Sequence, residues 1–164
     1  MEVLDACCGS RMFWFNKENP DVLFADIREE DHILCDGRKL HIAPDEVVDF
    51  RDMPFEDRSF NLVVFDPPHL KNLGDTSWMA KKYGKLNKVT WQDDLSRGFD
   101  ECWRVLDSGG TLVFKWNEDQ IKIREVLECF SQRPMFGHTT THNLKTIWMV
   151  FYKPTDEQNV EEGN

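Results

Sequence analysis

The sequence has 164 residues, of which 40% are hydrophobic, and its formal net charge is −10. This length suits one domain with a substantial core, and the negative charge argues against broad, non-specific binding to duplex nucleic acid. No apolar run approaches 18 residues, and the N-terminus lacks the basic and apolar regions of a signal peptide. Five cysteines without a Cys-x-x-Cys pair favour a reducing compartment, so we expect a cytoplasmic protein.

The start of the chain has the pattern of a nucleotide-binding unit. Residues 2–5 and 22–25 read as strands, and a turn of small residues, 6–10, follows the first. Residues 11–17 are predicted to start a helix with Ser10 as its N-cap, an arrangement that lets a ligand approach backbone N–H groups. Asp26 ends the second strand 21 residues after Asp5, where a carboxylate is suited to bind a ribose diol.

Residues 32–42 interrupt this alternation with a predicted hairpin. A two-residue Asp36-Gly37 loop would place Cys35 opposite Arg38 and His32 opposite His41. Two facing histidines beside a cysteine are a partial zinc-ligand set without a fourth ligand. A plain surface hairpin without metal is the favoured interpretation, and zinc binding is the alternative.

The most informative stretch is residues 61–69. Residues 61–65 form a short apolar run that predicts a buried strand, which Pro67 and Pro68 must end at Asp66. The Asp66 carboxylate and the Pro67 carbonyl are then two neighbouring acceptors, which suit an amine with two N–H groups, such as that of adenine or cytosine. The ring of His69 is placed to stack on such a base. The alternative is an ordinary strand end followed by a rigid turn.

A long segment with a local charge of +4, residues 70–90, follows this motif. It is predicted either to bind a polyanionic substrate or to be a solvated loop. The candidate substrate-binding residues in it are Lys71, Trp78, Lys81, Lys82 and Tyr83. Trp116, at the end of a later strand, is a further candidate for substrate binding. The alternative is that Trp116 only terminates that strand.

The remaining pattern predicts an α/β domain over residues 1–153, mostly parallel and with three layers. The predicted elements are a short strand at 46–49, a helix at 90–106, a strand at 111–116, a helix at 118–131 and antiparallel strands at 136–141 and 146–152. Residues 154–164 are polar and acidic and are predicted to be a disordered tail.

Taken in order, residues 4–10, 49–63 and 104–112 resemble class I S-adenosylmethionine-dependent methyltransferases, and the resemblance extends over residues 3–153. The Asp-Pro-Pro-His motif further resembles the Asp-Pro-Pro-Tyr-type enzymes that methylate adenine N6 or cytosine N4, and the small methyltransferases of phages and prophages. The resemblance implies a Rossmann-like fold with a mostly parallel seven-stranded sheet that ends in an antiparallel hairpin. It also implies that the protein is located in the cytoplasm of a bacterium or of a phage-infected host.

The resemblance implies a role for each matching residue. The methionine end of S-adenosylmethionine would be lined by Asp5, Ala6, Cys7 and Gly9. Asp26 would bind the ribose, Ile27 would pack on the adenine, and Asp49 and the Phe50 backbone N–H would bind the adenine edge. Asp66, in contact with the cofactor, would hold the target amine together with the Pro67-Pro68 turn, and His69 would stack on the target. The product would be S-adenosylhomocysteine.

Three departures from the family pattern change these expectations. Cys7 and Arg11 stand where the family often has glycine, and His69 stands where an aromatic ring is usual. The helix that often precedes the first strand is missing from the sequence. We therefore expect Arg11 or Arg28 to bind the cofactor carboxylate.

Three functional hypotheses remain. The first is an amino-methyltransferase acting on DNA or RNA, possibly single-stranded, with a protein partner that supplies target recognition. The second is a methyltransferase of a small molecule or a protein. The third is a cofactor-binding partner subunit without activity. The sequence does not determine the target base, its context or the oligomeric state.

Overall fold

The computed structural model describes residues 2–34, 36–74, 77–139 and 145–156. Seven strands form one sheet in the order β5-β2-β1-β6-β7-β9-β8, and β3 and β4 form a separate hairpin. The strands are β1 (Val3–Asp5), β2 (Val22–Asp26), β3 (Glu30–Ile33), β4 (Lys39–Ile42), β5 (Glu46–Val47), β6 (Phe60–Phe65), β7 (Leu106–Asn117), β8 (Phe136–Thr139) and β9 (Thr146–Tyr152). The helices are α1 (Trp78–Tyr83), α2 (Trp91–Val105) and α3 (Ile123–Glu128).

The sheet confirms the predicted architecture. Strand β1 pairs in parallel with β2 on one side and with β6 on the other, and β5 and β7 extend the parallel sheet outward. The final strands β8 and β9 are antiparallel to each other, and β9 is antiparallel to β7. The order of strands reverses between β1 and β6, and in open α/β sheets such a switch point is where ligands bind.

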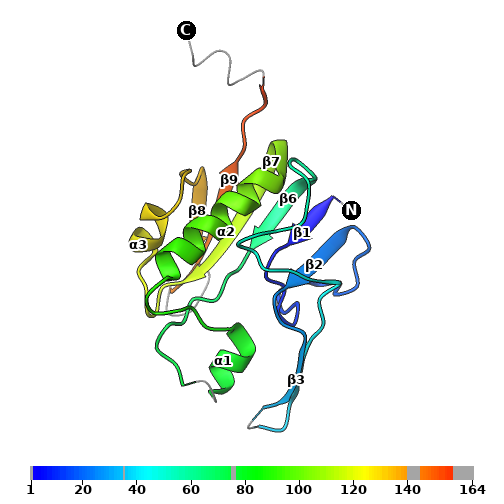
Figure 1. Cartoon of the computed structure of the whole chain (residues 1–164), viewed down its shortest axis with the longest axis vertical. Coiled ribbons are helices and arrows are strands. Elements are labelled where there is room, and N and C mark those ends of the chain that lie inside the picture. The colour runs from blue at the N-terminus through cyan, green and yellow to red at the C-terminus, as the bar shows by residue number, and fades with distance from the viewer. Residues whose placement is uncertain (1, 35, 75–76, 140–144, 157–164) are drawn as a thin grey trace.

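One face of the sheet carries the main core. Figure 1 shows α2 lying across the sheet in front of β6 and β7. The ring of Phe99 on α2 stacks on Phe130 at a centroid distance of 4.2 Å. Gly98 lets α2 approach the sheet closely, because a Cβ there would lie 2.4 Å from the ring of Phe50. Burial of these apolar faces is the main stabilising contribution to the fold.

The opposite face carries an irregular segment, residues 6–21. The helix predicted at residues 11–17 is wrong: these residues form turns and bends, and Arg11 at their start has a left-handed φ of 54°, which a helix does not allow. The segment is instead held by its aromatic rings: Trp14 packs edge-on against Phe24, and Phe13 packs edge-on against Trp148. Among the described residues, the layer that covers this face of the sheet is therefore an irregular loop.

The β3–β4 hairpin exists, but its predicted register is wrong. The Leu34 backbone N–H donates to the Arg38 carbonyl, which closes the hairpin one residue away from the expected register. His32 consequently pairs with Leu40 and His41 with Asp31, so the two histidines point to opposite faces. The two histidines of the alternative zinc interpretation therefore do not face each other, and Cys35 lies outside the described residues.

Several predicted boundaries also move. The 46–49 strand shortens to β5, the 118–131 helix shortens to α3, and the 70–90 segment contains α1. Figure 1 shows α1 and the β3–β4 hairpin at the same end of the molecule. Of the predicted tail, Asp156 is described and forms an ion pair with Arg58, and residues 157–164 lie outside the described part. None of the described helices is long and apolar enough to cross a membrane.

Candidate active site

A narrow cavity lies at the switch point, beyond the carboxyl ends of β1, β2 and β6, with a volume of about 60 Å³. Its walls are the turn after β1, the end of β2, Phe50, the Asp66-to-His69 motif and the last residues of α1. Of the predicted cofactor residues, the cavity is lined by Cys7, Gly9, Asp26, Ile27, Arg28, Phe50 and Asp66. Four others, Asp5, Ala6, Arg11 and Asp49, lie outside this lining.

Asp26 is fixed at the end of β2 by neighbouring donors. Its Oδ2 accepts from the Gly9 backbone N–H at 2.9 Å, and its Oδ1 accepts from the backbone N–H and Nε of Arg28 at 3.0 and 3.1 Å. Ile27, which follows it, is 50% exposed. A carboxylate beside an exposed apolar side chain is the pair of groups needed to bind the sugar and base of a nucleoside.

Arg28 also holds α1 against this cavity. Its Nη1 donates to the Lys81 carbonyl at 2.9 Å, across 53 residues of sequence. At the end of α1, Gly84 has a φ of 72°, and a Cβ there would lie 2.9 Å from Pro68. Lys82 and Tyr83 thereby line the cavity.

Asp5 supports the turn from below the cavity. It has no exposed surface, and its carboxylate accepts from Trp14 Nε1 at 2.7 Å and from the Cys7 backbone N–H at 3.3 Å. Burial raises the pKa of Asp5 to about 7, although both hydrogen bonds act to lower it. Burial also raises the pKa of the Cys7 thiol, so this thiol is uncharged at neutral pH and is not a nucleophile.

Arg11 occupies a left-handed position that glycine usually fills. Its side chain donates to the carbonyls of Lys17 and Ala43, forms an ion pair with Asp45 and lies 4.0 Å from the Phe24 ring centroid. These contacts offset the cost of the left-handed backbone. They also turn the guanidinium away from the cavity, so of the two arginines expected to meet a cofactor carboxylate, only Arg28 lines it.

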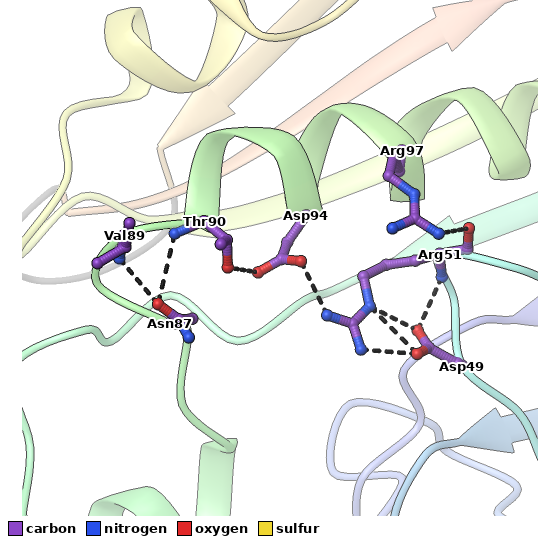
Figure 2. Close-up of polar contacts among 7 residues, drawn as sticks. All are labelled: Asp49, Arg51, Asn87, Val89, Thr90, Asp94 and Arg97. Carbon is purple, nitrogen blue, oxygen red and sulfur yellow. Dashed lines mark hydrogen bonds and ion pairs between the residues drawn. The ribbon is translucent and has the colours of Figure 1, made fainter.

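Asp49 belongs to a polar network that anchors the loop after β5 to the start of α2 (Figure 2). Its carboxylate accepts from the side chain of Arg51, which also donates to Asp94 at 2.8 Å. Thr90, the residue before α2, donates its hydroxyl to Asp94. The ion pair with Arg51 lowers the pKa of Asp49. The network fixes the chain on both sides of Phe50, the neighbour of Asp49 that lines the cavity.

A second cavity of about 540 Å³ adjoins the first. The two share four lining residues, Met12, Asp66, His69 and Tyr83. The rest of its wall comes mainly from the ends of β7 and β9, including Lys115, Asn117 and Trp148. The Asp66-to-His69 motif therefore stands between two cavities, one narrow and one large enough for a planar organic molecule.

An ion pair crosses this junction. Phe65 of β6 is level with Phe114 of β7, so Asp66 and Lys115 are neighbours in the sheet, and Lys115 Nζ lies 2.5 Å from Asp66 Oδ2. Burial raises the pKa of Asp66, and the charge and hydrogen bond of Lys115 act in the opposite direction.

His69 is a neutral ring at the same junction. Its ring centroid lies 5.5 Å from that of Tyr83 and 6.2 Å from that of Trp116. Burial, together with the nearby Lys115 charge, lowers the pKa of His69 to about 4. At neutral pH the imidazole is therefore available for stacking or for a neutral hydrogen bond.

The predicted substrate residues separate into two groups. Lys82 and Tyr83 line the first cavity, and Tyr83 also lines the second. Lys71 lies over the Trp91 ring, Trp78 is exposed on α1, and Lys81 contributes its carbonyl to Arg28. Trp116 has no exposed surface, and its indole N–H donates to the Ile121 carbonyl, so it is a core residue that supports His69 and not a surface for substrate.

Lys115, Met12 and Trp148 line the second cavity and were not among the predicted site residues. One signal was present, because Lys115 interrupts the apolar run of residues 111–116. A lysine inside a buried strand requires a partner, and the partner here is Asp66. Met12 and Trp148 carried no comparable signal, since isolated apolar side chains are most often core.

Comparisons with known proteins identify the fold of this chain. No family model and no curated protein matches the sequence. Among solved structures, it is similar to a protein of Pyrococcus horikoshii (TM-score 0.58, 16% identity, covering 94% of this chain and 82% of that one). It is also similar to an S-adenosylmethionine-dependent methyltransferase of Methanosarcina mazei, with a TM-score of 0.54 and 14% identity, covering 94% of this chain and 93% of that one. A third similar structure is an S-adenosylmethionine-dependent methyltransferase of Leishmania major, with a TM-score of 0.52 and 14% identity, covering 93% of this chain and 64% of that one. The chain therefore has the fold of S-adenosylmethionine-dependent methyltransferases.

Proposed function

We propose that this protein is an S-adenosylmethionine-dependent methyltransferase that methylates the exocyclic amine of a nucleic-acid base, adenine N6 or cytosine N4. The observation that carries the proposal is the position of Asp66 and His69 in the walls of two adjoining cavities. Methyl transfer needs a donor and an acceptor in line, and this junction is where the two reacting atoms would meet. The methyltransferase fold is an independent support.

The residues of the narrow cavity fit the cofactor by their chemistry. Asp26 offers carboxylate oxygens to a ribose diol, and Ile27 and Phe50 offer apolar surface to an adenine ring. Arg28 offers a cation to the cofactor carboxylate.

The acceptor side requires little chemistry from the protein. Bound S-adenosylmethionine supplies an electrophilic methyl group. Asp66 and the Pro67 carbonyl accept hydrogen bonds from the two N–H groups of the amine and direct its lone pair toward the methyl group. Transfer would form the N–C bond as the S–C bond of the cofactor breaks, with the thioether as leaving group and the amine proton released to solvent. The neutral ring of His69 stacks on the base.

The charge distribution supports a polyanionic substrate held locally. The chain carries a net charge of −10, yet α1 and the residues around it carry a cluster of lysines beside both cavities. Lys81 and Lys82 lie in the last turn of α1. A single strand with an unstacked base suits this arrangement, because the base enters the cavity while the phosphates meet the lysines.

The second candidate function is methylation of a small molecule. The acceptor cavity of about 540 Å³ is large enough to enclose a whole small substrate, and such a substrate needs no basic surface. The same cofactor cavity would serve both functions.

The test is methyl transfer from labelled S-adenosylmethionine to single- and double-stranded DNA, total RNA, and protein and metabolite extracts, assayed in parallel. Asp66→Ala is the test variant, and Asp52→Ala, an exposed aspartate outside both cavities, is its matched control. The proposal predicts label in nucleic acid that is lost in Asp66→Ala and kept in Asp52→Ala. Label only in metabolites would favour the second candidate. No label in any fraction, with cofactor still bound, would contradict both candidates.

A further inference from the structure

The ion pair between Lys115 and Asp66 has no part in the mechanism above, yet it occupies the centre of the site. The two side chains are only 20% and 19% exposed, and 2.5 Å separates Lys115 Nζ from Asp66 Oδ2. The ammonium also lies 5.2 Å from the ring centroid of Phe13 and 5.7 Å from that of Trp148. A lysine enclosed by a carboxylate and two rings is held in one position.

The pair leaves half of the carboxylate open. Asp66 Oδ2 accepts from Lys115, and among the residues that the structure describes Oδ1 accepts no hydrogen bond. Lys115 therefore orients the carboxylate and presents Oδ1 as an acceptor. One further N–H donor is needed to complete the site, and the proposed substrate amine supplies it.

The charges around Asp66 balance one another. Lys115 faces it from β7, and Lys145 pairs with Asp119 in the same cavity. His69 is uncharged at neutral pH, and the buried Asp5 and Cys7 lie on the β1 side. The two ion pairs give the acceptor cavity no net charge from the side chains that line it. An uncharged substrate enters such a site without leaving a charge uncompensated.

We propose that Lys115 is a positioning and specificity-determining residue that orients the Asp66 carboxylate through their ion pair and admits uncharged amines while excluding amines that carry a proton at neutral pH. The inference rests on the proposed function and narrows its acceptor class to aromatic amines, such as base amines, and away from lysine side chains and alkylamines. A protonated amine would compete with Lys115 for Asp66 and meet its positive charge at close range.

The first test needs no turnover. The Asp66 carboxyl is titrated by carbon NMR in the wild type, Lys115→Met, Lys115→Gln and Lys115→Arg, with Lys39→Met as an exposed lysine control. The Asp66 titration moves to higher pH in the methionine and glutamine variants, and it stays near the wild-type position in the arginine and Lys39 variants. An unchanged titration in both neutral variants would overturn the inference, whether or not an acceptor has been found.

The second test measures specificity by calorimetry with butylammonium chloride. Butylammonium binds Lys115→Met at least about tenfold more tightly than the wild type, because the competing cation is gone and the carboxylate remains. Butylammonium also binds Lys115→Gln more tightly than the wild type. This second neutral variant shows that the gain in affinity does not come from the packing of the methionine side chain. Equal affinities in the wild type and both neutral variants would overturn the inference.

The third test links the residue to the proposed reaction. With a base amine as acceptor, the acid limb of the kcat/KM profile moves to higher pH in Lys115→Met, and kcat at pH 7 falls about tenfold or more. A purely structural role would lower activity without moving the limb, which would contradict the inference. If the NMR and calorimetric results hold and the wild type methylates no base, the proposed acceptor is wrong and the role of Lys115 in setting the charge of Asp66 stands.

Discussion

Trp14 Nε1 donates a hydrogen bond of 2.7 Å to Asp5 Oδ2, and this contact joins the irregular segment 6–21 to the end of β1. The carboxylate is fully buried, and burial raises its pKa to about 7. The side chain at the start of the turn that lines the narrow cavity is therefore a structural acceptor below that cavity. Its titration has consequences for the stability of the protein.

Asp5 makes the protein less stable as the pH rises. The unfolded state releases this proton near pH 3.8, whereas the folded state keeps it until about pH 7, so stability is greatest below pH 4 for this group and is lost as the pH rises to 7. The shift corresponds to about 4 kcal/mol at most. We expect Asp5→Asn to flatten the decrease in unfolding free energy between about pH 4 and pH 7, as measured by urea denaturation at several pH values.

Trp14→Phe is the complementary variant. It removes a donor that favours the ionised form of Asp5, so the loss of stability should extend to higher pH than in the wild type. Identical pH dependence in the wild type, Asp5→Asn and Trp14→Phe would show that Asp5 is not the group responsible.

The two arginines near the proposed cofactor cavity should respond differently to substitution. Arg28 lines the cavity and holds both Asp26 and the Lys81 carbonyl, so Arg28→Ala should weaken S-adenosylmethionine binding about tenfold, or about 1.4 kcal/mol. Arg11→Ala should lower the thermal midpoint with a smaller effect on affinity, because its contacts are with Ala43, Asp45 and Phe24. Calorimetry and thermal unfolding of both variants check this, and a larger affinity loss in Arg11→Ala would contradict it.

The close contact between α2 and the sheet gives a stability prediction. In Gly98→Ala the new Cβ would lie 2.4 Å from Phe50 Cδ2 and 2.9 Å from Phe65 Cζ, so the helix or the rings must shift. Overpacking of this kind costs about 1–3 kcal/mol. Gly74→Ala is the matched control, since no atom lies within 4 Å of its Cβ position. Chemical denaturation should show the loss in Gly98→Ala alone, and equal stability of the two variants would contradict the packing account.

The sheet was predictable from the sequence because short local patterns of apolar residues identify its strands. The apolar run before Asp66 and the carboxylate at the end of β2 identify strand ends without reference to distant residues. The helix expected at residues 11–17 failed for the opposite reason. The left-handed Arg11 is stabilised by Ala43 and Asp45, which lie more than 30 residues away.

The candidate site was predictable in part. The positions that line the narrow cavity follow from the turn after β1 and from the motif at Asp66. The partnership of Asp66 with Lys115 depends on the pairing of β6 with β7 and on a register that brings residues 49 apart to the same level. The pairing of Asp49 with Arg51 is local, but its link to Asp94 depends on the packing of α2. Such contacts are tertiary and leave no pattern in sequence spacing.

The most direct test of the account is a single-turnover reaction with labelled S-adenosylmethionine and a single-stranded oligonucleotide, followed by nucleoside mass spectrometry. The wild type should yield N6-methyladenine or N4-methylcytosine. Asp66→Ala should bind the cofactor with near wild-type affinity by calorimetry and yield neither, because it keeps Asp26 and Arg28 and lacks the acceptor for the amine. Equal yields of the methylated base from the wild type and Asp66→Ala would contradict the central claim that Asp66 holds the acceptor amine.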